Sequence, residues 1–194
     1  MGAPDRLAAA AAIEAFLRAL GRDPSSEPEL VGTGERVAAA YLDELCDGYE
    51  VDVGALLRAE TIPGTTDVVA LRDIAVSTVC PHHLLPSTGS ASVAFGPGEK
   101  LVGLGTLVKV VDAYAHRLAL QEDIGQQVAE ALSSQLSARW AACRLVLDHA
   151  CVSSRGARRH GARAETVAFV GDRSFRPSAL GLLGAVSRAA EETP

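Results

Sequence analysis

The sequence lacks any long apolar run, although 48% of its 194 residues are hydrophobic. A membrane-spanning helix needs about 18 consecutive apolar residues, and no stretch of the chain approaches that length. The alanine-rich start, RLAAAAAIEAFLRAL, is interrupted by Glu14 and Arg18, and no small-residue cleavage site follows it. These absences predict a soluble, cytoplasmic protein without a signal peptide and without a membrane partner.

An excess of positive charge is also missing. The formal net charge is −6, and acidic and basic residues are interspersed along the chain. Proteins that bind DNA or RNA present a basic surface to the phosphate backbone. The composition therefore disfavours a nucleic-acid partner.

Cysteine and histidine are scarce, with four and five residues respectively. In a cytoplasmic chain, cysteines are more often buried thiols or metal ligands than members of a disulfide framework. Two of the cysteines and three of the histidines fall in two short stretches, STVCPHHLLPS and DHACVSSRG. These two stretches are the candidates for a functional site.

The pattern of the N-terminal part of the chain is typical of helices. Apolar residues recur at helical spacing over residues 5–20, and Gly21 is a suitable helix terminator. Residues 21–34 are rich in turn formers and predict a linker. A second helix is expected over residues 35–46.

The remainder of the chain consists of runs of strand patterns separated by runs of helix patterns. Each expected element is identified by β-branched alternation or by 3.6-residue periodicity. The expected elements are an antiparallel strand pair (67–79 and 89–96), two helices within 107–136 with a break before Gln121, a second strand pair (143–152 and 164–171) and a final helix (177–192). Strands and helices in separate runs predict an α+β fold.

The clustered cysteines and histidines suggest a metal site. Zinc favours thiolate and imidazole ligands, and a catalytic site usually has three protein ligands and a water. Cys80 and His83 are close enough in sequence to share an ion, and His149 and Cys151 could look into the same pocket from one face of a strand. The alternative is that the cysteines are buried thiols and the histidines are ordinary polar groups.

Three ordered segments, CPHH (80–83), GLGTLVKVVDAYAHRLALQE (103–122) and HACVSSRG (149–156), resemble motifs of the GTP cyclohydrolase I family. The resemblance covers about residues 30–190. It implies a tunnelling fold with an antiparallel sheet and two helices on one face, plus an N-terminal helical extension. Residues 1–30 would then form the N-terminal helix and linker, and residues 31–194 the catalytic domain. The resemblance also implies a homo-oligomer, a decamer of two pentameric rings, with pockets between subunits.

The resemblance further implies a role for individual residues around a Zn²⁺ cofactor. Cys80, His83 and Cys151 would bind the zinc. His82 would donate a proton to the purine ring, and His149 would assist hydrolysis and later proton transfers. These roles agree with general chemistry, because zinc lowers the pKa of water and histidine titrates near neutrality.

The substrate implied by the resemblance is GTP. Glu122, preceded by Gln121, matches the residue that reads the N1 and N2 edge of guanine, and a carboxylate can accept both N–H donors. A solvated glutamate at a helix N-terminus is the alternative interpretation. Residues at positions that would contact the triphosphate or ribose are Arg155, Arg36, Thr106 and Lys109.

Several family positions are changed in this chain. Pro81 replaces the glutamate of C-E-H-H, Gly105 and Thr106 replace a serine and a lysine, and AETVAF (164–169) replaces a threonine-rich stretch. The implied reaction is hydrolysis of GTP at C8, with formate release and ring closure to 7,8-dihydroneopterin triphosphate. The changes keep two alternatives open: a divergent enzyme of specialised metabolism that acts on another guanine nucleotide or stops at the ring-opened product, and a non-catalytic guanine-nucleotide-binding module.

Overall fold

The computed structural model describes residues 3–184, and the chain divides into two compact units, one ending at Asp47 and one beginning at Gly48. Within residues 3–184 no helix is long and apolar enough to cross a membrane. The border between the two compact units therefore follows Asp47. The expected domain boundary after residue 30 stays a prediction.

The first unit is a helical pair, as expected. Helix α1 (Arg6–Ala19) begins at Asp5, whose carboxylate accepts a hydrogen bond from the Ala8 amide at 2.9 Å, and Gly21 follows it with a φ of +77°. After the 3-10 turn η1 (Pro28–Leu30) comes α2 (Thr33–Ala40). The prediction of one α-helix over 35–46 is partly wrong, because the segment η2 (Tyr41–Leu45) that follows α2 is π-helical.

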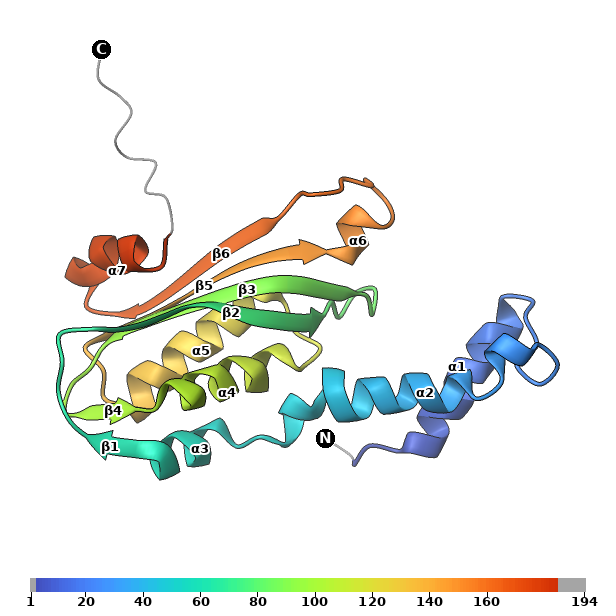
Figure 1. Cartoon of the computed structure of the whole chain (residues 1–194), viewed down its shortest axis with the longest axis horizontal. Helices are drawn as coiled ribbons and strands as arrows, with labels where there is room; N and C mark the ends of the chain where they lie inside the picture. Colours follow the sequence, from blue (N-terminus) through green and yellow to red (C-terminus); the bar gives the residue numbers. More distant parts are fainter. Residues whose placement is uncertain (1–2, 185–194) are drawn as a thin grey trace, which may run out of the picture. The chain divides into compact units, whose positions relative to one another are not determined.

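The second unit is built on one four-stranded antiparallel sheet in the order β2-β3-β5-β6 (Figure 1). The strands are β2 (Val69–Val79), β3 (Pro86–Gly96), β5 (Trp140–His149) and β6 (Ala164–Gly171). The sequence predicted two strand pairs, and the β3–β5 ladder joins them into a single sheet. Because strand pairing is non-local, sequence periodicity could not reveal this join.

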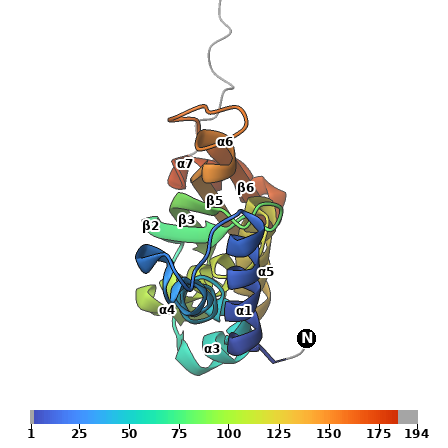
Figure 2. The same ribbon diagram turned by 90° about the vertical axis from the view of Figure 1, so that its right-hand side faces the viewer.

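Helices α4 (Leu104–Ala115) and α5 (Gln121–Gln135) cover one face of the sheet (Figures 1 and 2). The break before Gln121 is confirmed. The main core lies between these helices and the sheet and contains fully buried apolar side chains from all three, among them Phe95, Val110, Ile124, Leu132 and Leu145. Helix periodicity therefore located the two helices because each buries a continuous apolar stripe.

Several short elements were not anticipated. They are η3 (Asp47–Glu50), α3 (Val53–Glu60), the two-stranded sheet of β1 (Thr61–Pro63) and β4 (Lys100–Val102), α6 (Ala150–Ser153) and η4 (Arg173–Phe175). All are eight residues or shorter, so they give weak periodic signals. The final helix begins as expected near Pro177 as α7 (Arg176–Leu182), and residues 185–192 of the expected helix lie outside the described part of the chain.

The opposite face of the sheet carries a smaller apolar cluster. Trp140 stacks on Phe169 and on Phe175, with ring centroids 6.1 and 6.2 Å away, and Ala179 of α7 and Leu183 at its C-terminal end belong to the same cluster. The antiparallel sheet with two helices on one main face and the N-terminal helical pair confirm the expected α+β tunnelling fold.

Truncation of the α5 stripe should destabilise this fold. Leu132→Ala removes a side chain that is fully buried between α5 and the sheet, so unfolding should cost about 2–5 kcal/mol less than in the wild type. The exposed Gln126→Ala on the same helix is the matched control and should change stability by about 0.5 kcal/mol or less. Thermal unfolding of both variants measures this, and equal melting temperatures would contradict the assignment of this core.

Candidate functional site

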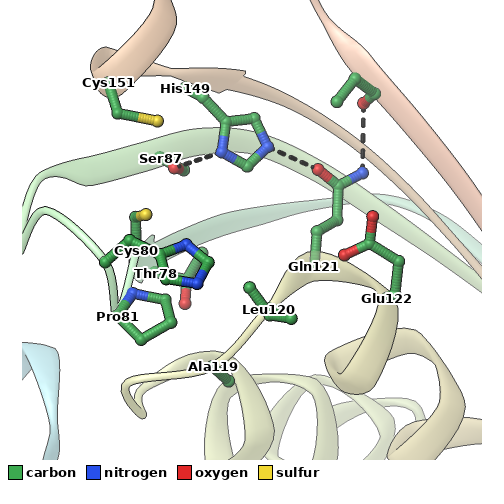
Figure 3. A pocket seen from close by; sticks show the side chains of 12 residues that line it. Thr78, Cys80, Pro81, Ser87, Ala119, Leu120, Gln121, Glu122, His149 and Cys151 are labelled. Atoms are coloured by element: carbon green, nitrogen blue, oxygen red, sulfur yellow. Dashed lines mark hydrogen bonds between the residues drawn. The ribbon is translucent and has the colours of Figure 1, made fainter.

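One end of the sheet brings three polar side chains into a row. Thr78 of β2 is paired with Ser87 of β3, and Ser87 is paired with His149 of β5. Directly opposed residues on antiparallel strands point to the same face, which here is the helix-covered face. The first turn of α5, with Gln121 and Glu122, lies below this row (Figure 3).

These residues line a pocket of about 190 Å³ (Figure 3). Its walls come from the ends of β2 and β5, the start of β3, the CPHH turn and the first turn of α5. The lining residues are Thr78, Cys80, Pro81, His82, Ser87, Ala119, Leu120, Gln121, Glu122, His149, Cys151 and Ala164.

The CPHH segment forms a tight turn between β2 and β3. The Leu84 amide donates to the Cys80 carbonyl at 2.9 Å, and the Cys80 amide donates to the Leu85 carbonyl at 3.0 Å. Leu84 closes the turn with a φ of +52°. Pro81 fits this turn because neither hydrogen bond needs its missing N–H.

Cys151 reaches the site in a way that the sequence did not predict. Strand β5 ends at His149, and Cys151 lies in the helical turn α6. His149 and Cys151 therefore do not share one face of a strand, and this prediction is wrong. The chain turns after His149, and this turn brings the thiol back to the pocket.

Three side chains gather at the rim of the pocket with the chemistry of a zinc site. One ligand atom from each of Cys80, His83 and Cys151 lies within 4.8 Å of the other two, and Cys80 Sγ is 3.7 Å from His83 Nδ1. Burial raises the pKa of the Cys151 thiol, and the neighbouring Cys80 thiol raises it further. Two thiolates this close repel each other, so a soft divalent cation is the partner that would stabilise them.

The two adjacent histidines of the turn differ in position. Their rings are nearly perpendicular, at 76°, with centroids 6.3 Å apart. His83 belongs to the ligand cluster, whereas His82 is among the residues that line the pocket. The structure therefore separates a potential ligand from a potential proton donor.

His149 is hydrogen-bonded at both ring nitrogens. Ser87 Oγ lies 2.9 Å from Nδ1, and Gln121 Oε1 lies 2.7 Å from Nε2 (Figure 3). Gln121 is 4% exposed, and its amide group also contacts β5 and β6. In this structure both the nitrogen and the oxygen of the Gln121 side chain thus form hydrogen bonds within the protein.

The remaining predicted substrate residues are more scattered. Arg155 is exposed just after α6, and its positive charge opposes the rise in the pKa of Cys151 that burial and Cys80 cause. Thr106, which is 4% exposed, and Lys109 lie on α4 and are not among the pocket-lining residues. Arg36 belongs to the first unit, where it donates to the Val31 carbonyl and to Thr33 Oγ1.

The model of the family described as GTP cyclohydrolase I matches residues 9–179. This chain belongs to the GTP cyclohydrolase I family. A GTP cyclohydrolase 1 of Leifsonia xyli subsp. xyli is 40% identical over 171 residues, which cover 87% of this chain and 88% of that protein. One of Allorhizobium ampelinum is 39% identical over 171 residues, which cover 87% and 84%. The crystal structure of an archaeosine synthase QueF-Like in the apo form aligns with 56% of this chain and 98% of that chain, at a TM-score of 0.45 and 19% identity.

In this member of the GTP cyclohydrolase I family, Cys80 and His82 of the CPHH segment and His149 and Cys151 of the HACVSSRG segment line one pocket, and His83 lies beside Cys80 and Cys151. Sequence reasoning missed Ser87, which is 1% exposed beside His149. A polar residue among the inward-facing positions of β3, where Ala91, Val93 and Phe95 follow, was the available signal.

Proposed function

We propose that this family member hydrolyses the imidazole ring of GTP at C8, releases formate and recloses the product to 7,8-dihydroneopterin triphosphate. The observation that carries the proposal is a single pocket that is lined by two histidines and a carboxylate and has a Cys-His-Cys cluster at its rim. Each of these groups would serve one chemical step of the reaction, as described below for the metal, the proton transfers and the binding of the base.

Cys80, His83 and Cys151 would hold a zinc ion. Two thiols and an imidazole are zinc donors, and three protein ligands leave a position for water. When bound, zinc supplies a Lewis acid that lowers the pKa of water and so provides a nucleophile at neutral pH.

His82 would protonate the purine ring while Glu122 holds the base. His82 lines the pocket next to the ligand cluster, and a histidine can donate a proton near neutral pH. Glu122 presents a carboxylate from the first turn of α5, where it can accept from N1–H and the 2-amino group of guanine. His149 lies across the pocket and would serve the later proton transfers.

A homo-oligomer would complete this site. The pocket of about 190 Å³ is smaller than the roughly 300–1,000 Å³ typical of small-molecule sites, so it has room for the base but not for the whole nucleotide. Arg155 is exposed and close enough to the pocket residue Cys151 to interact with it electrostatically, so its guanidinium group could bind a phosphate there. We propose that a neighbouring subunit supplies the remaining contacts, in a decamer of two pentameric rings.

Incubation of the zinc-loaded protein with GTP, GMP and guanosine, followed by mass spectrometry, tests this function. Formate and a pterin triphosphate from GTP are the expected products, and zinc-stripped protein, assayed before and after zinc is restored, is the control. Stoichiometric guanine-nucleotide binding without turnover of any of the three would contradict an enzymatic role.

A divergent activity is the second candidate, and it is favoured by Gly105. A Cβ at this position would meet nothing within 4 Å, so neither packing nor backbone strain requires a glycine here. The fold therefore does not explain the missing side chain in the first turn of α4. A product that retains the formyl group, or a preference for GMP or guanosine in the same assay, would support this candidate.

A further inference from the structure

His149 is held between two buried residues that come from different elements. Ser87 lies on β3 and is 1% exposed, and Gln121 begins α5 and is 4% exposed. Their side chains meet the two ring nitrogens at 2.9 and 2.7 Å (Figure 3). Rotation of the ring would leave polar atoms of both residues without a partner in a buried environment.

The orientation of the Gln121 amide follows from its other contacts. Its nitrogen lies 3.1 Å from the Leu145 carbonyl, the Ala164 carbonyl and Thr166 Oγ1. Carbonyl oxygens only accept, so the group that faces them must be the NH₂. Gln121 Oε1 consequently faces His149 Nε2, and this nitrogen must carry a hydrogen to donate.

The position of that hydrogen determines the role of Ser87. In a neutral imidazole with hydrogen on Nε2, Nδ1 has a lone pair and needs a donor. The hydroxyl of Ser87 can supply that donor because it lies opposite His149 in the β3–β5 register. The two hydrogen bonds thus select one tautomer and one ring orientation.

We propose that Ser87 is a positioning residue that, together with Gln121, holds His149 in the Nε2–H tautomer with a fixed ring plane. Its consequence for turnover rests on the proposed function of His149 as a proton-transfer group. Geometric placement of such a group affects the rate of the chemical step more than substrate binding. Ser87 therefore acts on the reaction through His149 and not through direct contact with the substrate.

Kinetics of Ser87→Ala and Ser87→Thr in the zinc-loaded protein test the positioning role. Loss of the hydroxyl leaves a buried acceptor without its donor, so kcat should fall about tenfold in Ser87→Ala. KM should stay within about twofold, because uniform substrate binding is unchanged. Ser87→Thr restores a hydroxyl and should recover most of the lost kcat.

Ser90→Ala is the matched control. Ser90 lies three residues along β3, on the opposite face, so its replacement removes a serine hydroxyl without touching His149. Its kcat should equal that of the wild type. Thermal unfolding of all three variants confirms that they are folded.

Nitrogen spectroscopy provides a readout that does not depend on turnover. Protein labelled with ¹⁵N-histidine and studied by solid-state NMR should show a protonated Nε2 and an unprotonated Nδ1 for His149. The His149 signals are assigned by their loss in His149→Asn. In Ser87→Ala the Nδ1 signal should move in the direction expected for a lost hydrogen bond, and Ser87→Thr should reverse the shift.

A proton on Nδ1 in the wild type would overturn the proposal, and so would an unchanged Nδ1 signal or an unchanged kcat in Ser87→Ala. These outcomes are distinguishable from failure of the proposed function. If the wild type does not process GTP, the function proposed above fails, and the nitrogen signals still decide the tautomer and the hydrogen bond to Ser87.

Discussion

Replacement of His82 by alanine is expected to lower kcat for GTP by about 10²–10⁴-fold, while the zinc content of the protein stays at the wild-type value. His82 lines the pocket, but it is not part of the Cys-His-Cys cluster. Loss of its imidazole therefore removes a proton donor and leaves the metal ligands in place. Turnover measured by pterin fluorescence, together with metal analysis, checks both halves of this prediction.

The adjacent His83 provides the matched comparison. Its Nδ1 lies 3.7 Å from Cys80 Sγ, so His83→Ala should lose zinc as well as activity. Partners of metal ligands alone affect metal affinity about 10–100-fold, and loss of a direct ligand should exceed that. Retention of full zinc by His83→Ala, or loss of zinc by His82→Ala, would contradict the division of roles within the CPHH turn.

Replacement of Glu122 by glutamine should lower kcat/KM for GTP by about 10–150-fold, because hydrogen bonds to a charged group are worth about 1.5–3 kcal/mol. The effect should also be selective. ITP lacks the 2-amino group, so the wild type should prefer GTP over ITP, and Glu122→Gln should lose much of that preference. Steady-state kinetics with both nucleotides measures the change.

Asp123→Asn separates base recognition from a general effect of charge. Asp123 lies in the same first turn of α5 and is exposed, but it is not among the pocket-lining residues. Both carboxylates interact favourably with the helix dipole. Equal effects of the two substitutions would show that Glu122 is a solvated helix-terminal residue, and kinetics like those of the wild type for Asp123→Asn would support recognition of guanine.

Periodic patterns in the sequence predicted the larger elements well. Helices α4 and α5, with their break before Gln121, and strand β6 lie where apolar periodicity placed them. The two helices each bury one face against the sheet, and this burial imposes the helical pattern on their residues. Short elements such as α3 and α6 have too few turns to show a period.

The candidate site was predictable to the extent that it is encoded in local motifs. Cys80, His82 and His83 lie within one turn, so their proximity follows from the chain itself. Cys151 joins them through a helical turn that strand alternation did not anticipate. The hydrogen bonds of the Gln121 side chain were not predictable, because its partners Leu145, Ala164 and Thr166 are distant in sequence.

The sequence by itself determined the fold class, the positions of the main helices and strands, and the motif residues that mark the GTP cyclohydrolase I family. Only the tertiary structure decided that β3 joins the two strand pairs, and that this join sets Ser87 opposite His149 above Gln121. The physical reason is that strand register and side-chain hydrogen bonds link residues that are distant in sequence, such as Ser87 and His149, which are 62 positions apart, and no local pattern records such pairings.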